Sequence, residues 1–398
     1  MEERVVPLAS AWRSDVEKGI FPVSFMEELK AQARAQGLWN LFLPALRGDE
    51  PGTRLTNLEY APLAEIMGRI SWASEVFNCS APDTGNMELL HLFGTPEQKR
   101  QWLQPLLEGR IRSAFGMTEP DVASSDATNI QTTIQRTDAG YVINGRKWYI
   151  TNAAHPDCRI MIVMGKTDPG APRHRQQSMV LVPMSTAGVT VVRNVTVMHH
   201  HAPHGHCEIL LRNVRVPLEN LLGGEGEGFA MAQARLGPGR VHHCMRCIGQ
   251  AELALELMVE RAKERSTFGK ALIEHGVVAD WIAESRMEIE QARLLVLKTA
   301  WMIDQVGAEG ARLEVALIKA IVPRMLTRVA DRAMQTFGAM GTGPDTPLAE
   351  IWTEGRALRI ADGPDEVHRR SIAKLEIAAS KQRRRSSGDY LIPPGRHA

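Results

Sequence analysis

The spacing of apolar residues changes twice along the chain, and this change restricts how the chain can fold more than any other feature. Between about Ser113 and Leu222, apolar and polar residues alternate, which is typical of half-buried β-strands. Before Ser113 and after Gly226, apolar residues recur every three or four positions, which indicates amphipathic helices. The sequence therefore predicts helices, then a small sheet, then a second set of helices.

The alternating block consists of short runs separated by turn residues, which favours a small antiparallel β-barrel. Strands do not alternate with helices there, and no stretch has the spacing of a dinucleotide fingerprint or a P-loop. The later helical block suits a four-helix bundle. The predicted fold is mainly α with a central β domain: an all-α domain at 1–112, a β-barrel at 113–224, a four-helix bundle at 225–382 and a tail at 383–398.

Length and charge narrow the class of protein. At 398 residues the chain is too long for one ordinary core and suits two or three packed domains. Its 47 Lys and Arg balance 46 Asp and Glu, so no overall field draws it to nucleic acid or to an anionic membrane. A membrane-spanning apolar run and a secretory signal are both absent from the sequence. The cysteines are scattered and odd in number, which favours reduced thiols and a cytoplasmic protein.

Three local patterns predict turns and caps. Asn144-Gly145 lies between alternating runs and predicts a hairpin turn. Thr95, followed by Pro96 and then Gln98, predicts a capping box at a helix start. The segment NCSAPDTGNMELL carries three polar residues that either line a pocket or cap helices, and capping is the favoured interpretation. They are Asn78, Asp83 and Asn86.

Two histidine-rich segments raise the question of a metal site, because imidazole and thiolate are the usual ligands of zinc. The first comprises His199, His200, His201, His204, His206 and Cys207, and the second comprises His242, His243, Cys244 and Cys247. Neither spacing matches a known zinc site, and the glycine and proline within the first segment indicate a surface loop. No physiological metal is predicted.

The stretch from Ser113 to Asn152 contains the groups needed to hold a flat heteroaromatic ring. Phe115 and Met117 supply one apolar face and Tyr149, with the preceding tryptophan, supplies another. Hydroxyls and backbone amides of the intervening loop could meet the polar edge of such a ring. An ordinary hairpin with a polar loop would have the same pattern, so the residue pattern alone leaves both interpretations open.

MTEPDVASSD followed by NGRKWYITN resembles the flavin-binding signature of the acyl-CoA dehydrogenase family. The stretches ERSTFGK, LGPGR and ADGPDEVH extend the resemblance from about residue 20 to residue 380. LGPGRVHHCMR and ADGPDEVH are most similar to the branch whose animal members are fused to a phosphotransferase-like kinase domain. The resemblance implies the same order of helical domain, β-barrel and four-helix bundle that the periodicity predicts.

The resemblance also implies a function, that of an FAD-dependent acyl-CoA dehydrogenase that forms a trans-2-enoyl-CoA. In this family a carboxylate removes the α-proton of the thioester, the β-hydrogen passes as hydride to flavin N5, and an electron-transfer flavoprotein accepts the electrons. A homodimer or homotetramer is implied as well. Three alternatives stay open: a same-fold oxidase or flavin monooxygenase that uses oxygen, an enzyme for 4-hydroxy or 4-phospho acyl-CoA, and a non-enzymatic scaffold.

The catalytic base of the family aligns with Asp362, where most relatives have glutamate, so its reach is one methylene shorter. An aspartate before Gly363 could instead cap a turn. Asp365 and Glu366 are rival bases, of which Asp365 is expected to face solvent. In relatives that carry the base on the first bundle helix, the matching position here is Gly239, which has no side chain. Burial beside flavin and thioester predicts a raised pKa for Asp362.

The remaining contacts are implied by alignment with the family. The flavin ring would stack on Tyr149 with the Thr151 hydroxyl at N5, and the pyrophosphate end would reach Arg265 across a subunit interface. Both Arg265 and Arg240 could instead serve structural ion pairs. The full cofactor set is Phe115, Met117, Thr118, Ser124, Ser125, Tyr149, Ile150, Thr151, Arg265, Ser266, Thr267, Gln335, Thr336, Gly338, Ala339, Pro364 and Glu366. The substrate set is Ser125, Gly237, Pro238, Gly239, Arg240 and Gly363.

Overall fold

A computed structural model describes residues 1–381 of the chain, so the tail predicted at 383–398 lies outside the described residues. The part before Arg112 is helical. Its α-helices are α1 (Ala9–Glu17), α2 (Met26–Ala35), α3 (Asn57–Gly68), α4 (Ala73–Val76), α5 (Asp83–Phe93), α6 (Pro96–Gln98) and α7 (Gln104–Leu107). The predicted capping box is present at α6, where Thr95 and Gln98 exchange hydrogen bonds of 3.2 and 3.0 Å.

A single sheet follows, in the strand order β6-β7-β3-β2-β4-β5-β8 with β1 paired to β4. Its strands are β1 (Arg112–Gly116), β2 (Thr133–Thr137), β3 (Gly140–Thr151), β4 (Cys158–Lys166), β5 (Gln177–Pro183), β6 (Val189–Asn194), β7 (His206–Val216) and β8 (Leu221–Leu222). The β1–β4 and β2–β4 pairings are parallel, and the other pairings in this sheet are antiparallel. The predicted central β domain is confirmed, and in place of the predicted antiparallel β-barrel the structure has one sheet in which antiparallel pairings predominate.

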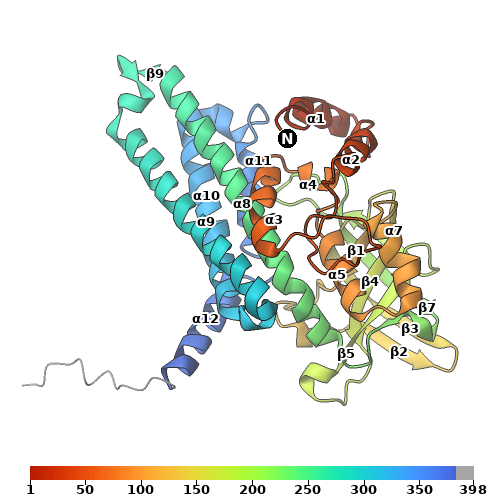
Figure 1. Ribbon diagram of the computed structural model, residues 1–398. Coiled ribbons are helices and arrows are strands. Elements are labelled where there is room, and N and C mark those ends of the chain that lie inside the picture. The colour runs from red at the N-terminus through yellow and green to blue at the C-terminus, as the bar shows by residue number, and fades with distance from the viewer. Residues whose placement is uncertain (382–398) are drawn as a thin grey trace, which may run out of the picture.

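The last part of the described chain is a helical bundle. Its elements are α8 (Gly228–Glu264), the hairpin β9 (Ser266–Thr267) and β10 (Lys270–Ala271), α9 (Gly276–Gly310), α10 (Arg312–Phe337), α11 (Leu348–Leu358) and α12 (Asp365–Ser380). Helix α10 packs against α8, α9, α11 and α12. In Figure 1, α8, α9 and α10 run side by side, and the β9–β10 hairpin lies at the end of α8 that is remote from the sheet. The predicted order of helices, sheet and helices is confirmed.

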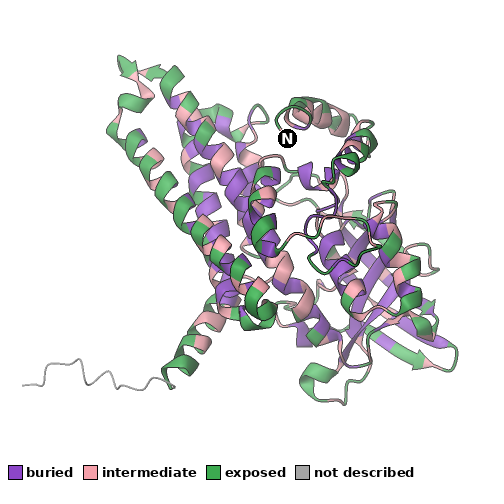
Figure 2. Cartoon of the chain, viewed as in Figure 1, coloured by how far each residue is buried: buried purple, intermediate pink, exposed green. Residues whose placement is uncertain are grey.

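The core occupies the bundle and both faces of the sheet (Figure 2). Alternation along β4 explains this arrangement, because Ile160 and Ile162 pack against the helices while Met161 and Val163 pack within the folded sheet. Within residues 1–381, none of the helices combines the length and the apolar character needed to cross a bilayer. All five cysteines are free and buried.

The predicted hairpin turn at Asn144-Gly145 is wrong. Strand β3 runs through both residues, and the turn between β2 and β3 falls where Thr137 pairs with Gly140. The two residues instead lie in a bulge against β7. A Cβ at Gly145 would lie 2.3 Å from Thr132 Oγ1, so the glycine serves a close approach of two chain segments and not a turn.

The favoured capping role of Asn78, Asp83 and Asn86 is also wrong. Helix α5 begins without a side-chain cap, and Asp83 instead accepts hydrogen bonds of 2.6 Å from both the backbone N–H and the hydroxyl of Ser113 in β1. Asn86 Nδ2 donates to the same hydroxyl at 2.9 Å, and Asn78 Nδ2 donates to Asn40 Oδ1 at 2.7 Å. These side chains therefore join the helices to one another and to the sheet.

Candidate active site

The two halves of the flavin-binding signature lie side by side in the structure. The Trp148 N–H donates to the Thr118 carbonyl at 3.1 Å, and the Thr118 hydroxyl donates to the Trp148 carbonyl at 2.6 Å. Tyr149 follows with a φ of 52°, in the left-handed region that non-glycine residues seldom adopt. Its side chain is 44% exposed, so its ring is available to stack on a ligand.

A buried ion pair, Lys147 with Glu119, supports this region through hydrogen bonds to its backbone. Lys147 is fully buried, and its Nζ donates to the carbonyls of Met117 and Met164 at 2.9 and 2.7 Å and to Glu119 Oε1 at 2.8 Å. Glu119 also accepts from the backbone N–H of Thr132 at 2.9 Å. Burial lowers the pKa of Lys147 to about 8 against the opposing effect of Glu119, and burial would raise the pKa of Glu119 but Lys147 lowers it. Both groups are therefore charged at pH 7.

Thr151 has a partner from the histidine-rich segment. Strand β3 pairs with β7 so that Thr151 lies opposite His206, and the hydroxyl is 3.0 Å from His206 Nδ1. Burial lowers the pKa of His206, which keeps the ring neutral at pH 7. Among residues 1–381, no group of three or more His, Cys, Asp or Glu side chains is placed to hold a metal ion. The segment instead presents one imidazole to the hydroxyl expected at flavin N5.

Arg235, on α8, connects the signature strands to the other side of the site. Its guanidinium carbon lies 4.0 Å above the ring centre of Phe115, and its Nε donates to Asn86 Oδ1 at 3.1 Å. Burial lowers its pKa, while the carboxylates of Asp362 and Glu88 act to raise it. One oxygen of Glu88 is buried without a hydrogen-bond partner, and burial raises the pKa of that group to about 8. Arg235 is thus a partly buried cation that lies over Phe115 and acts electrostatically on Asp362.

Asp362 lies in the loop between α11 and α12, and two cationic side chains hold the carbonyls of that loop. Arg240 Nε donates to the Asp362 carbonyl at 2.9 Å. Lys319 Nζ donates to the carbonyls of Ala361 at 2.7 Å and Gly363 at 3.4 Å. Asp362 itself has a φ of 55°, which aspartate tolerates better than most residues. The backbone of the loop is therefore fixed from α8 and α10.

The Asp362 carboxylate is surrounded by positive charge. Burial raises its pKa, but His243 and the three cations Arg235, Lys319 and Arg240 together outweigh burial and lower it. His243 Nε2 lies 3.5 Å from Asp362 Oδ2, and the Asp362 side chain is 23% exposed. The raised pKa predicted for Asp362 is not found in the free protein, because the sequence does not show that these cations converge on it. An ionised carboxylate is ready to accept a proton.

The two rival carboxylates differ in their surroundings. Asp365 was expected to face solvent, but it is 3% exposed and its Oδ2 lies 2.9 Å from Arg359 Nε. That expectation is wrong, because the loop turns back to begin α12 and buries the side chain there. Glu366 is exposed. Gly239 faces open space, since no atom lies within 4 Å of a Cβ built there.

A second group of predicted cofactor residues lies at the remote end of α8. Arg265 follows the helix directly, and Ser266 and Thr267 form β9. Phe268, at the hairpin tip, is 96% exposed. Figure 1 shows this hairpin well separated from the sheet that contains β3. The structure connects Phe115, of the predicted ring-binding residues, with Asp362 through Arg235, and it leaves the residues predicted for the pyrophosphate at another part of the molecule.

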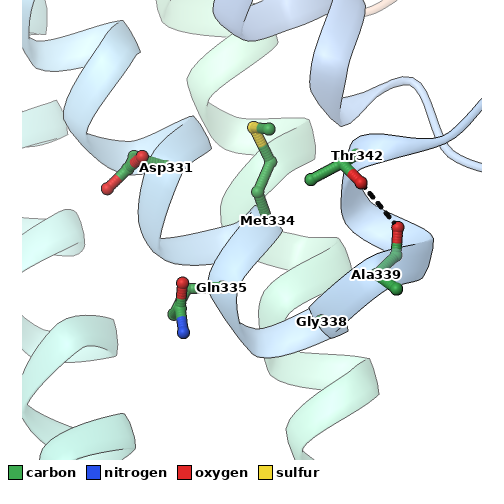
Figure 3. A pocket seen from close by; sticks show the side chains of 6 residues that line it. All are labelled: Asp331, Met334, Gln335, Gly338, Ala339 and Thr342. Carbon is green, nitrogen blue, oxygen red and sulfur yellow. Dashed lines mark hydrogen bonds between the residues drawn. The ribbon is translucent and has the colours of Figure 1, made fainter.

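The end of α10 forms a cavity near that hairpin. Gln335, Gly338 and Ala339 line it, and its volume is about 340 Å³. Figure 3 shows Gln335 on the same side of the helix as Asp331. Gly338 has a φ of 66°, and no atom lies within 4 Å of a Cβ built there. Thr336 is engaged differently, because it is buried and its hydroxyl donates to the carbonyl one turn earlier in α10 at 2.9 Å.

The remaining predicted residues have mixed surroundings. Ser124 Oγ accepts a 2.9 Å hydrogen bond from a backbone N–H and so shapes its loop, while Ser125 is exposed. The side chain of Ile150 belongs to the sheet core, which leaves only its backbone for a ligand. Gly237 is buried against α9, and Pro364 stands at the start of α12.

Comparisons with known proteins identify the family. The models "Acyl-CoA dehydrogenase, N-terminal domain", "middle domain" and "C-terminal domain" match residues 1–110, 114–214 and 226–376. The chain belongs to the acyl-CoA dehydrogenase family, which makes it an FAD-dependent oxidoreductase.

The curated relatives include a bacterial and an animal protein. "Probable acyl-CoA dehydrogenase FadE2" of Mycobacterium tuberculosis is 61% identical over 357 residues, which cover 89% of this chain and 86% of that protein. "Acyl-CoA dehydrogenase family member 10" of Mus musculus is 56% identical over 359 residues, which cover 89% of this chain. The match spans only 34% of the mouse protein.

Solved structures share the fold. A candidate acyl-CoA dehydrogenase from Mycobacterium abscessus has a TM-score of 0.92 and 50% identity, with 95% of each chain covered. Butyryl-CoA dehydrogenase from Megasphaera elsdenii has a TM-score of 0.79 and 29% identity, with 94% of each chain covered. The FAD complex of PigA has a TM-score of 0.81 and 25% identity, covering 93% of this chain and 94% of that one.

The residues present fit FAD. Tyr149 offers a half-exposed ring beside the hydroxyls of Thr118 and Thr151, as a flavin requires. Arg265 and the open space at Gly338 suit a pyrophosphate, because a guanidinium pairs with phosphate and a glycine admits close approach.

Proposed function

We propose that this protein is an acyl-CoA dehydrogenase in which Asp362 removes the α-proton of an acyl-CoA, giving a trans-2-enoyl-CoA. The observation that carries this proposal is a carboxylate, Asp362, whose pKa is lowered by Arg235, the same guanidinium that lies 4.0 Å above the ring of Phe115 next to the flavin-binding signature. An α-proton leaves a weakly acidic carbon, so the reaction needs a carboxylate that is already deprotonated and held in place. Asp362 meets both conditions.

The cofactor would be shared between two copies of the chain. Tyr149 and Thr151 would hold the flavin ring, and bound FAD would supply the acceptor for the β-hydrogen. Since Arg265 follows the end of α8 that is remote from the sheet, it would serve the FAD of a second copy, and so would Gln335 near the end of α10. This arrangement supports a homodimer or homotetramer. An electron-transfer flavoprotein is the proposed electron acceptor.

The protein's own side chains position the proposed base, Asp362. Aspartate is one methylene shorter than the usual glutamate, so its reach depends on where the loop lies. Arg240 and Lys319 fix the loop carbonyls from two different helices. Gly239, open on the same helix as Arg240, leaves room for the thioester end of the substrate. We retain the domain boundaries at 112, 224 and 382 and a cytoplasmic location as proposals.

A second candidate substrate class is favoured by the partly buried charge of Arg235. Among residues 1–381, Arg235 forms no salt bridge with a carboxylate, and its guanidinium lies over Phe115 and acts electrostatically on Asp362, so we propose that the acyl chain passes close to it. An alkyl chain gains nothing from such a group, whereas an oxygen substituent would be stabilised by it. This favours an acyl-CoA with a 4-hydroxy or 4-phospho group over an unsubstituted one. The oxidase or monooxygenase alternative is tested by oxygen uptake on adding acyl-CoA.

The proposal is tested by anaerobic reduction of the FAD-loaded protein with a series of acyl-CoAs. At least one should bleach the flavin, and Asp362→Asn should slow the bleaching by at least ~10²-fold while FAD content stays unchanged. Asp362→Glu should lower activity if the fixed loop leaves no room for another methylene. Asp138→Asn, an exposed change in the β2–β3 turn, is the matched control. A bleaching rate unaffected by Asp362→Asn would show that the base lies elsewhere.

A further inference from the structure

His243, on α8, touches the side chain of the proposed base. Its Nε2 lies 3.5 Å from Asp362 Oδ2, and both side chains are about three-quarters buried, with exposures of 22% and 23%. The sequence marked His243 only as a member of a metal-ligand candidate group, and the described residues form no such group. The contact joins α8 to the α11–α12 loop at the one side chain on which the proposed reaction depends.

The other nitrogen of the ring is also occupied. Arg246 Nη2 donates to His243 Nδ1 at 3.0 Å. A guanidinium has no acceptor atom, so Nδ1 must present its lone pair and the proton of a neutral ring must be on Nε2. Arg246 therefore fixes the tautomer of His243, with the N–H on Nε2, the nitrogen that lies 3.5 Å from Asp362 Oδ2.

The ring is neutral at physiological pH. Burial lowers the pKa of His243 to about 3, and the nearby charge of Arg246 acts in the same direction. His243 therefore offers Asp362 a fixed dipole and not a full charge. The other titratable or charged groups around the pair are Arg235, Arg240, Cys244 and Arg246 on α8, Lys319 on α10 and His368 on α12.

We propose that His243 is a positioning residue that holds one oxygen of the Asp362 carboxylate and leaves the other oxygen directed at the substrate. This inference rests on the proposed function, because it needs Asp362 to be the base. An aspartate has two free torsions, and the backbone contacts of Arg240 and Lys319 fix neither of them. His243 supplies the missing restraint, which a shorter-than-usual base needs more than glutamate would.

Two amide substitutions separate this role from simple packing. In His243→Gln the side-chain nitrogen stands near the position of Nε2 and can still donate to Asp362. In His243→Asn the amide stands near Nδ1, so it can accept from Arg246 but cannot reach Asp362. Both variants replace the ring by a neutral amide, and they differ in which of the two ring nitrogens that amide matches.

The FAD-loaded variants are compared by anaerobic reduction across pH 5–9 with an acyl-CoA that reduces the unaltered protein. His243→Asn should slow the reduction at saturating substrate by about 10- to 100-fold with KM little changed, since a misplacement of about 1 Å can cost that much. His243→Gln should stay within about 3-fold of the unaltered rate. Equal rates for both variants, whether high or low, would overturn the proposal.

A second measurement does not depend on turnover or on folding of these variants. Long-range proton–nitrogen NMR of ¹⁵N-histidine-labelled protein should show the His243 proton on Nε2, with the Nε2 signal shifting in Asp362→Asn. A proton on Nδ1, or no shift, would overturn the proposal. Should no acyl-CoA reduce the flavin, the proposed function fails, whereas the NMR result still decides whether His243 restrains Asp362.

Discussion

Replacing Lys147 by methionine removes the cation beneath the flavin-binding signature without removing much volume. The substitution leaves the Glu119 carboxylate buried without a counter-ion and leaves the carbonyls of Met117 and Met164 without their shared donor. Because Met117 belongs to the signature itself, we expect both the fold and the affinity for FAD to be weakened.

The size of the effect follows from burial. The two side chains are 0% and 4% exposed, so solvent does not screen the unpaired charge. Breaking a buried pair by removing one partner costs about 3–5 kcal/mol. Glu119 keeps hydrogen bonds from Gln131 and Thr132. The expected loss therefore lies near the lower end of that range, about 3 kcal/mol.

The assay is urea unfolding at fixed protein and FAD concentration, followed by the fluorescence of tryptophan and of FAD. Lys263→Met is the matched control, since Lys263 pairs with Glu260 at 3.0 Å on the surface with both side chains more than half exposed. The control should cost at most about 0.5 kcal/mol. Glu119→Gln combined with Lys147→Met should cost less than the sum of the two single changes, by about 1 kcal/mol or more.

A decrease in the free energy of unfolding of less than about 1 kcal/mol for Lys147→Met would refute the reasoning, because a buried carboxylate without a counter-ion destabilises the fold by more than that. Strict additivity of the two single changes would refute it as well. In that case the lysine would contribute by packing alone, and the hydrogen bonds to the signature would not matter for FAD.

Further predictions concern the base and acid stability. Adding Gly239→Glu to Asp362→Asn should recover flavin reduction by about 10-fold or more, because nothing lies within 4 Å of a Cβ there; no recovery would mean that position 239 faces away from the substrate. Since cations lower the pKa of Asp362, the pH profile of kcat/KM should show no acid limb from this group between about pH 5 and 8. Arg235→Met removes one of these cations and should move the acid limb to higher pH. An acid limb near pH 6 in the unaltered protein would contradict this prediction. Burial would raise the pKa of Glu75, but Arg112 and other cations lower it from 4.5 to about 2, so its stabilisation is present above pH 4.5 and lost as pH falls toward 2. That loss is about 3 kcal/mol, and Glu75→Gln should flatten the acid limb of urea unfolding midpoints.

The overall order of the fold could be predicted because apolar spacing is a local property of each element. The same locality explains the wrong hairpin at Asn144-Gly145. A glycine that makes a turn and a glycine that lets Thr132 approach have the same sequence neighbours, and only the packing of a segment more than ten residues away distinguishes them. The mistaken caps at Asp83 and Asn86 have the same origin, since their partner Ser113 lies in another element.

The site could be predicted to the extent that its residues match a family pattern. Asp362 and the signature around Tyr149 are proposed in this way, but residues that act through tertiary contacts are not. His243 meets Asp362 only because α8 passes the α11–α12 loop. Lys147 lies within the signature, yet nothing in the sequence pattern indicates that its side chain is fully buried. Asp365 looks like any polar loop residue until the start of α12 encloses it.

The continuity of α8 has a mechanical consequence. Arg240 holds the Asp362 loop near one end of this helix, and Arg265 follows its other end, about 38 Å away at about 1.5 Å per residue. Between them Gly249 lies against α3, where a Cβ would come within 1.8 Å of the Glu65 carbonyl. We therefore expect α8 to pivot as a rigid body about its close contact with α3 at Gly249. A tilt of about 5° about Gly249 would displace Arg265, which lies about 24 Å along the helix, by about 2 Å. A substitution at Gly249 should therefore affect both the proposed base of one chain and the cofactor proposed to bind Arg265 in its neighbour.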